Sequence, residues 1–193
     1  MNKEIELKCE ISDIPQLKEM KDIEIYKISQ NYIYQDKFSS IRVRSIFNPK
    51  CNKAEYVYTV KTKGNIQDNY SLYEIESNIT EQEYEQMQEL SNHVIEKYRI
   101  KIPLNNKLMA ELDLYNRILE GLLTVEVEFP NEEELKKFSK PNWFGKNLDK
   151  KIFSNANLSK MTREQFLNMI DRESYERNVC IRKEIEKMIK NLL

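Results

Sequence analysis

The chain has 193 residues, which is long enough for one domain with a hydrophobic core and short for two. Lys and Arg total 31 against 32 Asp and Glu, and the formal net charge of -1 argues against a nucleic-acid-binding surface. Apolar residues at 40% and aromatic residues at 10% exclude a disordered chain. Charged residues make up 33%, above the usual quarter or so, so their placement carries the information.

Alternating apolar and polar residues predict eight β-strands in the first two thirds of the chain. Their approximate ranges are 3-9, 26-34, 40-47, 56-63, 71-78, 94-102, 107-115 and 122-129. Turn residues such as Asn48-Pro49 and Lys63-Gly64-Asn65 separate several of them. Antiparallel strands with few short helices favour a closed or nearly closed barrel whose charged residues face inward and whose helices cover the outside.

Capping signals predict short helices between and after the strands. We expect helices from Ser12 to about Asp22, after the capping box at Thr80, after Asn131 and from Thr162 into the C-terminal tail. Apolar residues recur at helical spacing in this tail, which we expect to pack on the exterior of the sheet.

Other features of the sequence limit the possible classes of site. Cys9, Cys51 and Cys180 are far apart and form no C-x-x-C pair, which is typical of reduced thiols and argues against a zinc or disulfide framework. His93 is the single histidine, which excludes a histidine-based metal cluster or triad. No apolar run reaches the roughly 20 residues that span a membrane, and no secretory segment opens the chain. We therefore expect a cytoplasmic protein without a membrane partner.

Charged residues are segregated by sign along the predicted strands. Successive strand side chains point to opposite faces, so residues two apart share a face. The same-face positions are Glu4, Glu6 and Lys8; Arg42 and Arg44; Thr59 and Lys61; Glu74 and Glu76; Lys97, Arg99 and Lys101; Glu111 and Asp113; and Glu126 and Glu128. A solvated sheet face remains an alternative, but it should mix both signs within a strand. Segregated pairs suit carboxylates around a hard cation and Arg or Lys around phosphate oxygens.

These segments resemble, in order, the motifs of the CYTH domain, also called the triphosphate tunnel metalloenzymes. The matching segments are Glu4-x-Glu6-x-Lys8, Arg42-Val43-Arg44, Thr59-Val60-Lys61 with Gly64, Glu74-Ile75-Glu76, Lys97-Tyr98-Arg99, Glu111-Leu112-Asp113 and Gly121-Leu122 through Glu126-Val127-Glu128-Phe129. Trp143-Phe144-Gly145 and Asn155-Ala156-Asn157-Leu158 resemble the closing segment of the family. Asn147 stands where relatives often carry Glu, and Asp149 where they carry Thr or Ser.

The resemblance implies a mainly β, α+β fold: an eight-stranded antiparallel closed barrel, the triphosphate tunnel, with helices packed outside. It covers residues 1-158, and residues 159-193 would form a helical extension packed on the same domain. The resemblance also implies Mg²⁺ or Mn²⁺ as the cofactor. The implied metal ligands are Glu4, Glu6, Glu126 and Glu128, and the implied phosphate ligands are Lys8, Arg42, Arg44, Lys61, Lys97 and Arg99. Glu74, Glu76, Glu111 and Asp113 would complete the acidic wall.

The implied activity is metal-dependent hydrolysis of inorganic triphosphate, with a small-molecule triphosphate as the partner and no nucleic acid. Glu4 and Glu6 would serve this reaction through the metal, and a further hypothesis gives Lys61 and Tyr32 a role in proton transfer. A class IV adenylate cyclase, a thiamine or nucleoside triphosphatase, an RNA-end triphosphatase and a non-catalytic polyphosphate-binding module remain alternatives. A homodimer also remains open.

Overall fold

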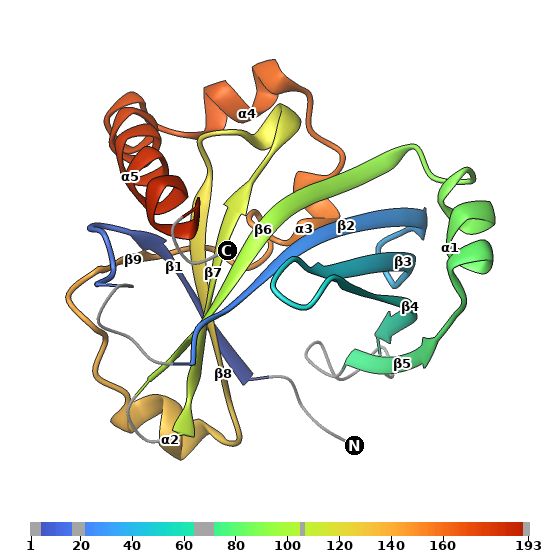
Figure 1. Ribbon diagram of the computed structural model, residues 1–193, viewed down its shortest axis with the longest axis horizontal. Helices are drawn as coiled ribbons and strands as arrows, with labels where there is room; N and C mark the ends of the chain where they lie inside the picture. Colours follow the sequence, from blue (N-terminus) through green and yellow to red (C-terminus); the bar gives the residue numbers. More distant parts are fainter. Residues whose placement is uncertain (1–4, 17–21, 64–71, 105–106, 191–193) are drawn as a thin grey trace.

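The structure, a computed structural model, describes residues 5–16, 22–63, 72–104 and 107–190 (Figure 1). Its centre is an antiparallel nine-stranded sheet with the order β5-β4-β3-β2-β6-β7-β8-β1-β9. The strands are β1 (Ile5–Ile11), β2 (Glu24–Gln35), β3 (Ser39–Asn48), β4 (Lys53–Lys63), β5 (Leu72–Asn78), β6 (His93–Pro103), β7 (Met109–Tyr115), β8 (Leu123–Phe129) and β9 (Phe144–Asn147).

All eight predicted strands are present, with ends shifted by a few residues, and residues 3, 4 and 71 of the predicted ranges lie outside the described residues. The ninth strand, β9, was not predicted. It is four residues long, too short to show a period-2 pattern, and it pairs with β1 through an irregular register at Cys9↔Asn147 and Ile11↔Phe144. In the part of the chain that the structure describes, strand pairing runs linearly from β5 to β9. The pairing therefore supports the mainly β antiparallel prediction and leaves closure into a barrel unconfirmed.

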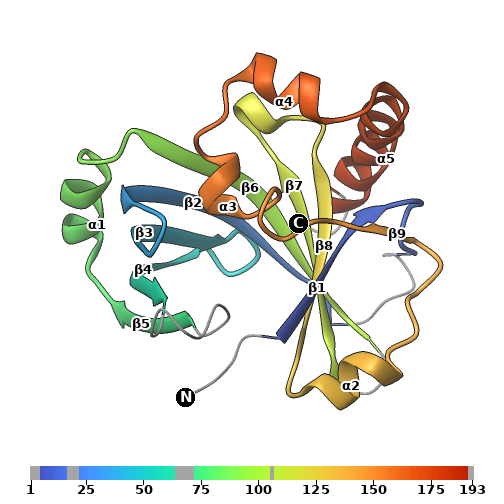
Figure 2. The ribbon, with the colours of Figure 1, turned by 180° about the vertical axis from the view of Figure 1, so that it is seen from behind.

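Helices lie around this sheet, at its ends and along one face. They are α1 (Glu81–Gln88), α2 (Glu132–Lys137), α3 (Asn155–Leu158), α4 (Arg163–Met169), α5 (Arg172–Lys190) and a short 3₁₀ helix (Arg117–Leu119). The predicted capping boxes at Thr80 and Thr162 are confirmed, and Asn131 accepts a hydrogen bond from the backbone N–H of Glu134 as a helix cap. Figures 1 and 2 show α1 beside the outer ends of β2 and β6, far from α5.

The predicted helix from Ser12 is wrong over residues 12–16, which are not helical, and residues 17–21 lie outside the described residues. Ser12 is tied to the segment before β9 instead of capping a helix. Its backbone N–H donates to Trp143 O at 3.0 Å and its hydroxyl donates to Asn142 O at 3.1 Å. These contacts hold Ser12 beside β9.

Buried apolar side chains form two clusters on opposite faces of the sheet. The larger cluster contains the apolar residues that alternate with the charged ones, such as Leu112 and Val125. They pack against Ile181 and Ile185 of α5. The smaller cluster lies at one end of the charged face, where Tyr32 and Tyr115 join Leu158 of α3 and Phe166 of α4. The apolar face is thus covered by helix, and the charged side chains remain together on the other face.

All three cysteines carry free thiols; Cys9 is buried, and Cys51 and Cys180 are exposed. Burial raises the pKa of the Cys9 thiol, an effect that Lys140 opposes. Among the helices that the structure describes, none combines the length and the apolar character needed to cross a bilayer. The boundary between residues 1-158 and 159-193 remains a prediction.

Candidate active site

The strand register places the charged positions of neighbouring strands side by side on one face of the sheet. Arg42 pairs with Thr59, which pairs in turn with Glu76, and Lys61 pairs with Glu74. Residues directly opposite each other in an antiparallel pair have their Cβ atoms about 4.5–5.5 Å apart, so the predicted groups of each strand meet their neighbours. The same alignment continues through β6, β7, β8 and β1.

On β3, β4 and β5 the cations and carboxylates interleave. The Arg42 guanidinium lies 3.2 Å from Glu74 and that of Arg44 lies 2.8 Å from Glu76, while Lys61 Nζ is 3.3 Å from Glu74. Thr59 donates a hydrogen bond to Glu76 at 2.9 Å. Burial would raise the pKa of Glu76, but the Thr59 hydrogen bond and the nearby Arg44 and Arg42 charges lower it.

The Arg42 and Arg44 guanidinium groups each carry a hydrogen-bond donor that no acceptor in the described part of the chain uses. The Nε atom of each is buried and makes no hydrogen bond among the described residues. Burial and the like charge of Arg42 lower the pKa of Arg44, and the charge of Arg99 from β6 adds to the effect. An anion at this place would accept the two orphan N–H groups and relieve the repulsion between the cations.

The second group of charges, on β6, β7 and β8, is more deeply buried. Asp113 is fully buried and is contacted by Lys97 Nζ and by Arg99, whose Nε donates to Asp113 at 2.7 Å. Arg99 also contacts Glu111 and lies 3.0 Å from Glu126. Burial and the neighbouring Arg99 charge lower the pKa of Lys97 to about 8. Arg99 differs, because the charges of Asp113, Glu126 and Glu111 outweigh its burial and raise its pKa.

Lys8 links β1 to this group. Its ammonium is buried, lies 2.7 Å from Glu126 and donates to the carbonyl oxygen of Phe153 at 2.7 Å. Burial alone would lower the pKa of Lys8, but its interactions with Tyr115 and with the Glu126 carboxylate outweigh burial and raise that pKa. Burial alone would likewise raise the pKa of Glu126, and Lys8, Lys97 and Arg99 hold it well below its usual range.

Tyr32 and Lys61, the predicted proton-transfer pair, lie on neighbouring parts of the same face. Tyr32 is buried on β2 directly opposite Arg42 on β3, and its hydroxyl accepts a hydrogen bond from Gln30 at 2.5 Å. Burial raises the pKa of Tyr32, and the Arg42 charge partly opposes it. Tyr32 therefore keeps its proton near neutral pH, so this phenol is suited to donating a hydrogen bond. The roles of Tyr32 and Lys61 remain predictions.

The predicted metal ligands lie on β1 and β8. Glu6 pairs directly with Glu128, and Glu126 pairs with Glu111, so like charges face each other at both places. Glu4 lies outside the described residues. Within the described residues, no group of three or more Asp, Glu, His or Cys side chains is placed to hold a metal ion.

The donor set nevertheless fits Mg²⁺ or Mn²⁺. Mg²⁺ is commonly held by one or two carboxylates together with substrate phosphates and water, rather than by a complete protein cage. Glu6 and Glu128, opposed across β1 and β8, supply such a pair of hard oxygen donors, and Lys150 lies 3.7 Å from Glu6 beside them.

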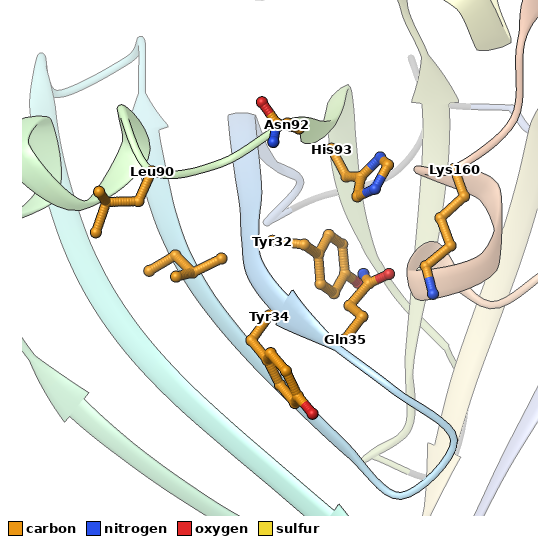
Figure 3. Close-up of a pocket in the computed structure, with 8 residues that line it drawn as sticks. Tyr32, Tyr34, Gln35, Leu90, Asn92, His93 and Lys160 are labelled. Carbon is orange, nitrogen blue, oxygen red and sulfur yellow. The ribbon is translucent and has the colours of Figure 1, made fainter.

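A separate cavity of about 380 Å³ opens beyond the end of β2. Figure 3 shows side chains from β2, β6 and the segment after α3 around this cavity. Tyr32 is among them and also lies opposite Arg42 of the charged face. The residues that line it are Tyr32, Ile33, Tyr34, Gln35, Leu90, Asn92, His93 and Lys160. None of the predicted phosphate or metal ligands lines it, so we place the candidate active site on the charged face instead.

Several residues at this face were not among the predicted site residues. Tyr115 lies opposite Lys97, with its ring centroid 5.3 Å from Lys97 Nζ, and its hydroxyl donates to Asn155 at 2.7 Å. Its position two residues after Asp113 was the available signal, because residues two apart share a face. Gln30 and the Phe153 carbonyl left no signal, since an uncharged amide and a main-chain oxygen do not stand out in a sequence.

No protein-family model matches the chain. An inorganic triphosphatase of Nitrosomonas europaea is 32% identical over 95 residues, which cover 49% of this chain and 60% of that relative. The match therefore spans less than two thirds of the relative's length.

Solved structures share the fold over more of the chain. The crystal structure of the inorganic triphosphatase NE1496 has a TM-score of 0.60 and 26% identity, and covers 83% of this chain and 97% of that one. The Hippeastrum protein HpAC1, whose structure is described as revealing a dominant triphosphatase activity, has a TM-score of 0.50 and 14% identity, and covers 69% of this chain and 83% of that one. The latter shows the fold alone.

The antiparallel, mainly β sheet therefore shares its fold with the solved structure of the inorganic triphosphatase NE1496. The sequence match and the NE1496 structure confirm the resemblance to the CYTH, or triphosphate tunnel, family.

Proposed function

We propose that this protein hydrolyses inorganic triphosphate with the help of a divalent cation, on the charged face of its sheet. The observation that carries the proposal is the pair of orphan Nε–H groups of Arg42 and Arg44. Both Nε–H groups are buried, their guanidinium groups repel each other, and neither finds an acceptor among the residues that the structure describes. A polyanion satisfies such an environment. The inorganic triphosphatases among the similar proteins support the same substrate.

In this proposal the cations bind and orient the triphosphate. Arg42, Arg44 and Lys61 contact phosphate oxygens from the β3 and β4 side, and Lys8, Lys97 and Arg99 contribute positive charge from the β1 and β6 side. Guanidinium groups suit this task because they bind two oxygens at once and stay charged. The side chains of Lys8 and Lys97 are almost completely buried, whereas those of Arg42, Arg44 and Arg99 keep part of their surface exposed. We therefore assign direct phosphate contact first to the three arginines.

The metal would be held by Glu4, Glu6, Glu126 and Glu128. When bound, a divalent cation neutralises phosphate charge and lowers the pKa of a water molecule. Water attacks a terminal phosphorus, the bond from that phosphorus to the bridging oxygen breaks, and pyrophosphate leaves with phosphate as the second product. The cationic side chains are held in place by four carboxylates, those of Glu74, Glu76, Glu111 and Asp113. The Tyr32 hydroxyl, opposite Arg42, donates a hydrogen bond to the substrate.

We further propose that residues 1-158 form the functional domain and that its antiparallel strands close into a tunnel around the charged face. The extension at 159-193 belongs to the same domain through its contacts with the larger apolar cluster. A homodimer stays a prediction.

The test is to incubate the purified protein with tripolyphosphate or ATP, each with Mg²⁺, Mn²⁺ or a chelator, and to measure phosphate and cyclic AMP. We expect metal-dependent phosphate release from tripolyphosphate, strongly reduced in Arg44→Gln and Glu6→Gln. Arg172→Gln is the matched control, because Arg172 is an exposed arginine on α5 away from this face. Cyclic AMP from ATP with little phosphate would instead identify a cyclase, and binding without turnover would identify a binding module.

A further inference from the structure

The C-terminal helices hold the connection between β7 and β8 with polar side chains, of which Asn178 and Arg182 are buried. The contacts are Arg163 to Ile118 O at 3.0 Å and to Glu120 O at 2.6 Å, Asn178 to Gly121 O at 3.0 Å, Arg182 to Asn116 Oδ1 at 2.6 Å, and Arg182 to Tyr115 O. Figures 1 and 2 show α4 and α5 lying against this connection, drawn in yellow. These contacts come from residues beyond the segment that the family motifs cover.

Arg182 has a particular place among them. It is 9% exposed, and each of its three guanidinium nitrogens donates a hydrogen bond: Nε to Glu186 at 2.7 Å, and the two terminal nitrogens to Tyr115 O and to Asn116. Tyr115 is the last residue of β7, so Arg182 fixes the point at which the chain leaves the sheet.

Tyr115 connects this point to the candidate active site. Its fully buried ring packs against the Lys97 ammonium, and its hydroxyl donates to Asn155. Lys97 in turn contacts Asp113, which also receives two hydrogen bonds from Arg99 at 2.7 Å. A displacement of Tyr115 would therefore move Lys97, and with it the Asp113 and Arg99 pair.

We propose that Arg182 is a positioning residue for the triphosphate site. It acts through Tyr115 to set the place of Lys97 and Asp113, and so the geometry in which Arg99 meets the substrate. This inference rests on the proposed function, because its readout is the handling of triphosphate.

Packing alone does not account for an arginine at this position. Ile181, Ile185 and Ile189 already bury α5 against the larger apolar cluster. A buried guanidinium loses its hydration, and an apolar residue of similar length often stabilises a protein as well or better. The planar fork instead matches a backbone carbonyl and an amide oxygen at fixed positions, which specifies geometry rather than only stability.

The experiment compares Arg182→Met with Asn178→Ala, the matched control. Both residues lie on α5 and both donate to the β7–β8 connection, but Asn178 contacts the Gly121 carbonyl oxygen before β8, whereas Arg182 contacts Tyr115 itself. We measure kcat and KM for tripolyphosphate, with circular dichroism and Tm to verify folding. A misplacement of about 1 Å costs up to about 100-fold in rate, so we expect kcat of Arg182→Met to fall about 10- to 100-fold with a far smaller change in KM. Asn178→Ala should lower Tm and keep kcat.

Two further variants separate positioning from stability. Arg182→Lys keeps the charge and one donor, and should recover part of kcat. In a Tyr115→Leu background the effect of Arg182→Met on kcat should nearly vanish, because both changes break the same path. Equal losses of kcat in Arg182→Met and Asn178→Ala, or independent effects of Arg182 and Tyr115, would overturn the inference.

Failure of the proposed function has a different signature. A wild-type protein that binds tripolyphosphate without hydrolysing it refutes hydrolysis. The inference is then tested by calorimetry, in which Arg182→Met should show a larger dissociation constant for tripolyphosphate than the wild type. A wild-type protein that neither binds nor hydrolyses tripolyphosphate overturns both proposals. An active wild type with an unaffected Arg182→Met overturns the inference alone.

Discussion

At the scale of single residues, the site is a network of ion pairs in which acids and bases alternate. The sequence predicted which residues share a face, because the period-2 alternation of a strand dictates it. It did not predict that Lys8 would lie between Glu126 and the Phe153 carbonyl, since pairing depends on the register of strands far apart in the chain. The predicted phosphate ligands thus differ in exposure, with Lys8 and Lys97 buried and Arg42 and Arg44 half-buried.

Glu126→Gln should destabilise the protein in the absence of metal and substrate. The substitution leaves the buried ammonium of Lys8 without its carboxylate partner, and breaking one half of a buried ion pair costs about 3 kcal/mol or more. Urea denaturation measures the loss of unfolding free energy. Glu128→Gln is the control, because Glu128 is exposed on the same strand. A loss no greater than that of the control would mean that Lys8 is satisfied without Glu126.

The pH dependence of stability should reveal Lys97. Its pKa is lowered to about 8 in the folded protein, below its ordinary 10.5, so between these values the unfolded chain binds more protons. The free energy of unfolding therefore rises with pH in this window, by an amount on the order of 1–3 kcal/mol. Lys8 has a raised pKa and stays charged in both states there.

The difference between wild type and Lys97→Met, measured by denaturant unfolding from pH 7 to 10.5, isolates this contribution. In the variant Asp113 keeps its two hydrogen bonds from Arg99. Parallel pH profiles of the two proteins would show that Lys97 keeps its proton throughout.

At the scale of elements, the sequence predicted the strands and helices that have long, regular patterns and missed the short or irregular ones. The eight longer strands follow from alternation, and two capping boxes mark the starts of α1 and α4. Strand β9 escaped prediction because its four residues carry little pattern. The helix predicted from Ser12 failed because local capping propensity was overridden by hydrogen bonds to Asn142 and Trp143, about 130 residues away.

Thr80→Ala should lower stability by about 1 kcal/mol, which is the usual cost of losing an N-cap side chain. Thr80 accepts from the Glu83 backbone N–H, and the Glu83 side chain returns a contact to the Thr80 backbone. Thermal unfolding followed by circular dichroism measures the change. Thr80→Ser keeps the hydroxyl and serves as control; an equal loss in both variants would assign the effect to the methyl group of threonine.

At the scale of the whole molecule, the net charge is only -1, but the charged residues are unevenly distributed between the two faces of the sheet. One face is apolar and covered by α5, and the other gathers buried charges of both signs. Such a face is costly without a ligand, since buried charges lose hydration and like charges are brought together. Binding energy from a polyanion can offset that cost.

Tripolyphosphate should therefore raise Tm, with or without a divalent metal. A ligand at 100 times its dissociation constant adds about 2.7 kcal/mol to the stability of the state that binds it. Differential scanning fluorimetry measures the shift, which we expect to shrink in Arg44→Gln and to persist in Arg172→Gln. A Tm shift that requires the metal would mean that the metal ion, and not the arginines, provides most of the binding free energy.

The cysteines described above offer a direct way to observe this binding. Cys9 is buried with a raised pKa, so thiol reagents near neutral pH should react slowly with it. Cys51 follows β3, on the half of the sheet that carries Arg42 and Arg44, and Cys180 lies on α5, against the other half. A pair of spin labels or fluorophores on the two exposed thiols of the native sequence would therefore report whether the two halves of the sheet approach each other when triphosphate binds.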